Sequence, residues 1–138
     1  MSILLQLAAT AGMTGLIWLV QLAHYPSFHH LDPTRFSEAM IAHQNRISFV
    51  VVPLMLSELG LASWNLWQHR SPEVIAAAVL IAGIWLSTML VQVPLHQTLL
   101  NDGHNPQTIQ KLVNTNWVRT ALWSLNLLVI LRAAVQAL

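Results

Sequence analysis

Four long stretches of the chain carry almost no charge, and polar segments separate them. Residues 3–23 and 74–100 contain no Asp, Glu, Lys or Arg, residues 47–67 contain only Glu58, and residues 117–137 contain Arg119 and Arg132. About 20 residues of helix, at 1.5 Å per residue, cross a hydrocarbon core of roughly 30 Å. The pattern therefore predicts four membrane-spanning helices over these ranges.

The segments between the spans predict how the helices are connected. Residues 24–46 are polar and contain Pro26 and Pro33, and they predict an amphipathic helix that runs into the second span. Residues 68–73 form a short turn, and residues 107–116 predict a short amphipathic helix after a turn over 101–106. Connections of this length make consecutive helices antiparallel neighbours.

The expected fold is therefore all-α, an antiparallel four-helix transmembrane bundle. It forms a single integral-membrane domain over residues 1–138, with amphipathic interfacial segments in its first and third connections. Both termini and the second turn are expected on one side of the membrane, and the other two connections on the opposite side.

Composition supports a membrane protein and excludes several classes. Charged residues make up 8% of the chain and apolar residues 55%, whereas a soluble domain carries roughly 25% charged residues. The net charge of +1 gives no electrostatic footprint for nucleic acid. Cysteine is absent, which excludes disulfides, iron–sulfur clusters and thiolate catalysis. Residues 3–23 have no positive n-region before them and are too long for a signal peptide.

Histidine departs from the apolar bias. The chain has 7 histidines, against 6 Lys and Arg and 5 Asp and Glu. The topology places six of them on the side of the first and third connections and His69 on the other. Among the six, His24, His43 and His96 fall at similar depth near the ends of three spans, whereas His29, His30 and His104 are expected at the surface.

Helical phase predicts that polar side chains line a shared interior, because each span carries one polar stripe. Four such stripes cannot all face lipid, so they should face one another and line a pocket that opens on the histidine side. The four stripes are Gln6, Thr10, Thr14, Gln21 and His24; His43, Arg46, Val50, Leu54, Ser57 and Glu58; Thr88, Gln92 and His96; and Asn116, Arg119, Trp123 and Asn126.

Three histidines are the candidates for catalysis or metal binding. Neutral imidazole suits iron, copper and zinc, so His24, His43 and His96 are predicted as ligands of a transition metal or haem, or as acid–base groups. The alternative is that each hydrogen-bonds a neighbouring group at a helix interface. No H-x-x-x-H or E-x-x-H spacing occurs within a span. The carboxylates are too few for a ferritin-type di-iron site.

Other polar residues are candidates for substrate contacts or proton transfer. Arg46 and Arg119 either snorkel to headgroups or hold a substrate oxygen. Tyr25 either donates a hydrogen bond to the substrate or belongs to an interfacial belt, and Gln92 and Asn116 join the predicted substrate set. Glu58 lies about 18 Å deeper than Arg46 in a straight helix, and an ionisable group at that depth is a functional candidate by default.

Three short motifs add a family resemblance: His24-Tyr-Pro-Ser-Phe28, Val91-Gln-Val-Pro-Leu-His96 and Asn116-Trp-Val-Arg-Thr120. Together they resemble the small four-helix integral-membrane proteins of the superfamily that includes the fungal anthrone oxygenases. Those relatives carry Val-Pro-Leu-Asn at the end of the third span, where this chain has His96. The resemblance implies an oxygenase or oxidoreductase for an apolar aromatic or quinone-like molecule. It also implies Pro94, His96, Asn116, Arg119 and His24 as pocket residues.

The functional expectation is a membrane-embedded oxidoreductase whose partners are membrane lipid and a hydrophobic small molecule. One alternative is a non-enzymatic protein that binds lipid, quinone or haem, or a small subunit of a membrane complex or homo-oligomer. A transporter is disfavoured because four spans without an evident inverted repeat are too few to enclose a path. The expected location is the bacterial plasma membrane. Four Lys and Arg on the histidine side against two on the other place that side in the cytoplasm.

Overall fold

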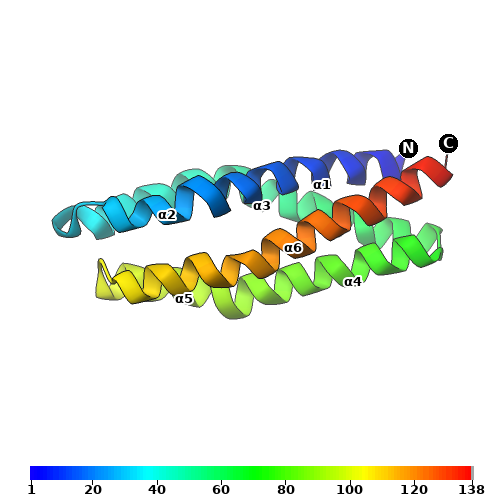
Figure 1. Cartoon of the computed structure of the whole chain (residues 1–138). Helices are drawn as coiled ribbons and strands as arrows, with labels where there is room; N and C mark the ends of the chain where they lie inside the picture. The colour runs from blue at the N-terminus through cyan, green and yellow to red at the C-terminus, as the bar shows by residue number, and fades with distance from the viewer. Residues whose placement is uncertain (138) are drawn as a thin grey trace.

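The computed structural model describes residues 1–137, and in this range the chain is helical almost throughout. It passes along the molecule four times: α1 (Ser2–Leu19) extended by short turns to His30, α3 (Phe36–Gln68), α4 (Pro72–Ser87) extended through α5 (Val93–Asp102), and α6 (Pro106–Gln136). Both chain ends lie at one end of the molecule, which we call the terminal end (Figure 1). The opposite end, with the connections from α2 (Tyr25–Ser27) to α3 and from α5 to α6, is called the histidine end.

All four passes are long and apolar enough to cross a membrane. They extend over Ser2–His30, Pro33–Gln68, Pro72–Asp102 and Pro106–Gln136. Large apolar side chains such as Phe49, Trp67 and Leu90 are 83%, 73% and 71% exposed. A water-soluble surface carries few such side chains, whereas lipid accepts them. The prediction of an all-helical chain with four potential spans is therefore confirmed.

Caps and prolines set where the helices begin. The Asp32 carboxylate accepts the Thr34 backbone N–H at 2.8 Å just before Pro33, where the sequence predicts a capped start. Asn105 accepts two N–H groups of α6, and Pro106 follows it. No breaker follows Pro106, so the segment 107–116 is the first part of α6 and not a separate short helix. Likewise α3 runs unbroken from Phe36 through Pro53.

Two π-helical turns interrupt the first and third passes, and the sequence analysis did not predict them. They are η1 (Val20–His24) and η4 (Thr88–Gln92), which end just before Pro26 and Pro94. A proline ring clashes with the carbonyl four residues earlier and has no N–H to donate. A π-turn accommodates this because its hydrogen bonds span five residues. In both cases the proline stands two residues after the last residue of the π-turn.

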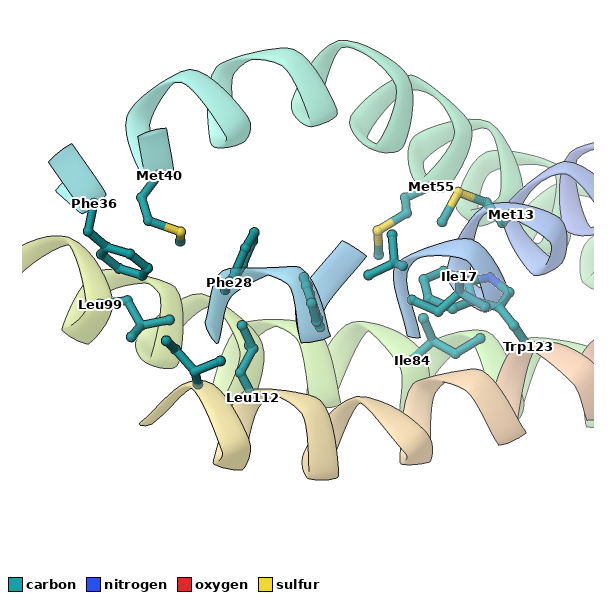
Figure 2. Close-up of a cluster of buried hydrophobic side chains, with 13 residues drawn as sticks. Met13, Ile17, Phe28, Phe36, Met40, Met55, Ile84, Leu99, Leu112 and Trp123 are labelled. Atoms are coloured by element: carbon teal, nitrogen blue, oxygen red, sulfur yellow. The ribbon is translucent and has the colours of Figure 1, made fainter. Parts of the chain in front are cut away.

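The core is built from apolar side chains of all four passes. Near the histidine end Phe28, Phe36, Met40, Leu99 and Leu112 form one group, and farther in Met13, Ile17, Met55, Ile84 and Trp123 form another (Figure 2). A smaller cluster around Ile3 and Ile130 packs near the terminal end. The candidate functional site lies between the two groups shown in Figure 2.

Candidate functional site

A cavity of about 310 Å³ lies between α3 and the pass formed by α4, η4 and α5, with α1 and α6 behind it. Most of its wall is apolar and includes Met13, Ile17, Val51, Met55 and Trp85. These residues were missed by the sequence analysis, because an apolar residue in an apolar span carries no distinguishing signal. The cavity is thus shaped for a mostly apolar ligand.

Polar side chains gather at one end of this cavity. Tyr25, His43, His96 and Arg119 line it there, and Gln92 and Thr88 continue along the η4 side. The Tyr25 and His96 rings have centroids 5.5 Å apart, and His96 stacks on His43 at 6.2 Å. The tertiary structure thus brings together at one cavity four of the predicted site residues, His43, His96, Tyr25 and Arg119.

His96 is held in a defined orientation. Its Nδ1 lies 2.8 Å from the backbone oxygen of Gln92, one turn earlier. A carbonyl can only accept, so we assign the proton of a neutral His96 to Nδ1, which leaves the Nε2 lone pair free. The widened turn η4 ends at Gln92, so it fixes the direction of both residues. A free imidazole nitrogen beside a cavity can accept a proton from a ligand.

His24 does not line the cavity. Its Nε2 lies 2.6 Å from Nδ1 of His43, and the two ring centroids are 4.3 Å apart. His43 does line the cavity, so His24 contacts the cavity only through His43. One of the two nitrogens must donate and the other accept, so the pair shares a proton and at least one ring is neutral.

The predicted metal site has no support in this geometry. Within residues 1–137, no three His, Cys, Asp or Glu side chains are arranged so that they could hold a metal ion. Two of the nitrogens that would have to bind the metal instead bind each other, in the His24–His43 contact. The contacts of His24, His43 and His96 agree with the alternative interpretation, in which each histidine hydrogen-bonds a neighbouring group.

Arg119 is a buried cation that borders the cavity. It is 5% exposed, and its guanidinium lies 5.1 Å from the Trp123 ring centroid and beside the Tyr25 hydroxyl. Its Nη1 donates to Asn116 at 3.3 Å, and its Nε has no partner. Arg119 forms no ion pair within residues 1–137. Its charge is therefore available to a partly negative ligand oxygen.

Asn116 supports Arg119 instead of contacting a ligand, contrary to the prediction. It is fully buried and outside the cavity, donates to Gln21 Oε1 at 2.9 Å and accepts from Arg119. Gln21 in turn donates to the Val113 backbone oxygen at 3.1 Å. This network ties η1 to α6. Gln92 does line the cavity as predicted, and its amide donates to Thr115 at 3.1 Å.

Arg46 is not part of the site. It is exposed on α3, whereas the cavity face of that helix follows His43, Ile47, Val51 and Met55. The predicted stripe through Arg46, Val50 and Ser57 is therefore wrong, because these residues lie on the outer side of the helix. The stripes predicted on the other three passes do face the interior.

Glu58 is also outside the cavity, as its predicted depth implies. It is 2% exposed, and its Oε2 accepts a hydrogen bond from Trp123 Nε1 at 2.9 Å. The predicted role of Glu58 in handling a proton stays a prediction, for a layer deeper than the histidines.

No protein-family model, curated protein or solved structure matches this chain. The resemblance to the anthrone oxygenase superfamily therefore stays a prediction that rests on the three sequence motifs.

Proposed function

We propose that the protein is a membrane-embedded oxidoreductase of the oxygenase type that acts on an apolar aromatic or quinone-like molecule. The observation that carries this proposal is the lining of the cavity. Most of the lining is apolar, and His43, His96, Tyr25 and Arg119 meet at one end of it. A ligand with an apolar ring system and one oxygen would satisfy both parts.

The ligand would enter from the bilayer. Exposed residues of the cavity wall lie on facing passes: Ser48 and Val52 on α3, and Met89, Val93 and Gln97 on η4 and α5. All of them lie within the helices that are long enough to span a membrane. Membrane lipid would then be both the solvent of the protein and the source of its hydrophobic ligand, which need not cross water.

The polar end provides the groups that an oxygenation of an activated ring carbon requires. His96 Nε2, or His43, would take a proton from the ring CH₂ of a substrate such as anthrone. Arg119 and Tyr25 would donate to the oxygen on which negative charge then develops. Dioxygen is the oxidant, and anthrone plus O₂ gives anthraquinone plus water, which balances. No step here is routed through a metal or haem.

The test uses the protein purified in mild detergent with anthrone as substrate, and it measures oxygen consumption and anthraquinone formation. We expect His96→Gln to lower kcat at least about 10²-fold, the low end of what an acid–base group contributes. His30→Gln is the matched control, because His30 is exposed and outside the cavity.

Binding is measured separately, by quenching of tryptophan fluorescence with a naphthoquinone, since Trp85 lines the cavity. Quinone binding without any oxygen consumption would identify a non-enzymatic binding protein instead. If the wild-type protein shows neither quinone binding nor anthrone turnover, the proposal is wrong.

A further inference from the structure

A second group of buried polar side chains lies toward the terminal end, away from the cavity. We call it the inner polar group, and its members are Gln6, Thr10, Glu58, Asn65 and Asn126. Each is at most 2% exposed. Each also has at least one side-chain N or O atom without a hydrogen-bond partner, and Asn126 has two.

The hydrogen bonds within the inner polar group do not satisfy all of its side-chain nitrogen and oxygen atoms. Asn65 Nδ2 donates to Gln6 Oε1 at 2.7 Å, so Gln6 Nε2 and Asn65 Oδ1 remain. Trp123 Nε1 occupies one oxygen of Glu58, and Oε1 remains beside the Thr10 hydroxyl. Buried polar atoms are almost always paired with protein or ordered water. The Thr10 hydroxyl can donate to Glu58 Oε1, but Gln6 Nε2, Asn65 Oδ1 and both polar atoms of the Asn126 amide still lack partners, and these atoms indicate a ligand that can both donate and accept.

The members lie on successive levels of the bundle. Thr14 donates to the backbone oxygen of Trp123 at 3.2 Å, which puts these two residues level. Because α1 and α6 run in opposite directions (Figure 1), Thr10 is level with Asn126 one turn nearer the terminal end. The Gln6–Asn65 pair lies about 6 Å farther on.

An open cavity begins one turn beyond that pair. This terminal cavity of about 530 Å³ is lined by Ile3, one turn before Gln6, and by His69, whose backbone N–H donates to the backbone oxygen of Asn65. Inward from the terminal cavity, past the apolar turn around Ile3, polar groups follow in order: first Gln6 and Asn65, then Thr10, Glu58 and Asn126. On the other side the route stops at Trp123, because an indole N–H donates but cannot accept a proton.

Glu58 forms no ion pair within residues 1–137, and the buried cation Arg119 packs on the ring of Trp123, whose Nε1 donates to Glu58. The ion pairs within residues 1–137 are Arg35–Glu38 and Arg132–Glu73, both of which involve exposed arginines. A carboxylate buried between membrane-spanning helices without a counter-ion is strongly disfavoured. A neutral carboxylic acid, in contrast, gains an O–H that can donate to Thr10 or to water.

We propose that the inner polar group binds water that is continuous with the terminal cavity, and that Glu58 is a neutral carboxylic acid whose proton exchanges through this water. The site is separate from the histidine cavity and does not depend on the function proposed for it. It gives the protein a proton-accessible group that is reached from the terminal end, whereas His24 and His43 lie at the opposite end.

Infrared spectroscopy of the full-length protein in lipid vesicles tests both parts. We expect a carbonyl band of a protonated carboxyl group at neutral pH, which shifts to lower frequency within minutes of transfer to D₂O. Glu58→Gln should remove this band. Glu38→Gln should leave it, because Glu38 is exposed and paired with Arg35.

The route is tested by Asn65→Leu, which replaces the polar gate to Glu58 by an apolar side chain of similar volume. We expect hydrogen–deuterium exchange of the band to slow at least tenfold. Asn114→Leu, on the exposed side of α6, should leave the rate unchanged. Asn65→Leu and Asn114→Leu both keep the Glu58 carboxyl group, so the exchange of its band can be measured in them even when Glu58→Gln fails to fold.

Three results would overturn the proposal. Absence of the carboxylic acid band would show that Glu58 is ionised. A band that does not respond to D₂O would show a dry site. Exchange in Asn65→Leu at the wild-type rate would show that the water does not reach Glu58 past the Gln6–Asn65 pair.

Discussion

His24 and His43 are neighbours that can play different parts, because only one of them reaches the cavity. His43 lines the cavity wall, and His24 bonds its Nδ1 from behind at 2.6 Å. Phe28 packs edge-on against both rings, with centroids 5.2 Å away in each case. These contacts make His24 a positioning residue that orients His43 and shares its proton.

Replacing His24 by alanine is expected to lower kcat by about tenfold to a hundredfold, which is less than the direct loss of an acid–base group. KM should change little, since no ligand contact is removed. Steady-state kinetics with anthrone separate the two constants, and added imidazole should restore part of the rate. If imidazole does not restore kcat, and kcat falls in proportion to the fraction of folded protein, the role of His24 is purely structural. His30→Ala serves as the control.

At the scale of the element, the π-turns decide where the functional side chains point. Each adds one residue to a turn, so the residues that follow are rotated by about 100° relative to a continuous α-helix. Through η1 and η4 the chain brings Gln21, Tyr25, Gln92 and His96 inward. The same device in α1 and α4 therefore supplies two walls of one site.

Pro94→Ala is expected to weaken naphthoquinone binding at least tenfold without lowering the thermal unfolding temperature. The alanine restores an N–H that can bond four residues back, which favours closing η4 into an α-helix and turning His96 away from the cavity. Fluorescence quenching measures the affinity. Pro72→Ala is the control, because Pro72 is at the first position of α4, where no such bond exists. Unchanged affinity in Pro94→Ala would mean that packing alone maintains the π-turn.

For the whole molecule, the structure changes the charge count that sets orientation. Arg119 is buried, so it does not act as a surface charge, whereas Arg46 is exposed. The histidine end then has Arg35, Arg46 and Lys111, and the terminal end has Arg70 and Arg132. Three against two still favours a cytoplasmic histidine end.

Because the chain has no cysteine, single cysteines can report this orientation. A membrane-impermeant thiol reagent added to intact bacterial cells should label Ser71→Cys, at the terminal end, and not Ser37→Cys, at the histidine end. Permeabilised cells should label both, which controls for reactivity. The reverse pattern would invert the orientation, and labelling of both in intact cells would contradict a membrane-spanning arrangement.

The fold class and many of the inward-facing polar residues follow from the pattern of apolar and polar residues along the chain. Charge-free stretches are visible without a structure, because a span must be apolar over its whole length. Polar residues in such stretches must avoid lipid, and from this rule we correctly predict that Gln6, Thr10, Asn116 and Asn126 face the interior. The rule failed on α3 for two residues. Arg46 lies just before the predicted span and remains on the outer side. Ser57 also remains outside, because its hydroxyl donates to the backbone oxygen of Pro53 at 2.7 Å.

Which inward-facing residues share a site depends on how the helices pack against one another, and the sequence pattern does not give this. Periodicity gives the face of a helix but not its rotation after a π-turn, nor its axial offset from its neighbours. Those two quantities put His43, His96, Tyr25 and Arg119 around one cavity, left His24 behind His43, and placed Asn116 beneath Arg119. They also placed Trp123 against the carboxyl group of Glu58, a contact that the predicted depth of Glu58 does not give. The rotation and the axial offset of a helix are set by side-chain contacts between segments that are far apart in the sequence. The polar and apolar pattern of a single segment therefore cannot predict them.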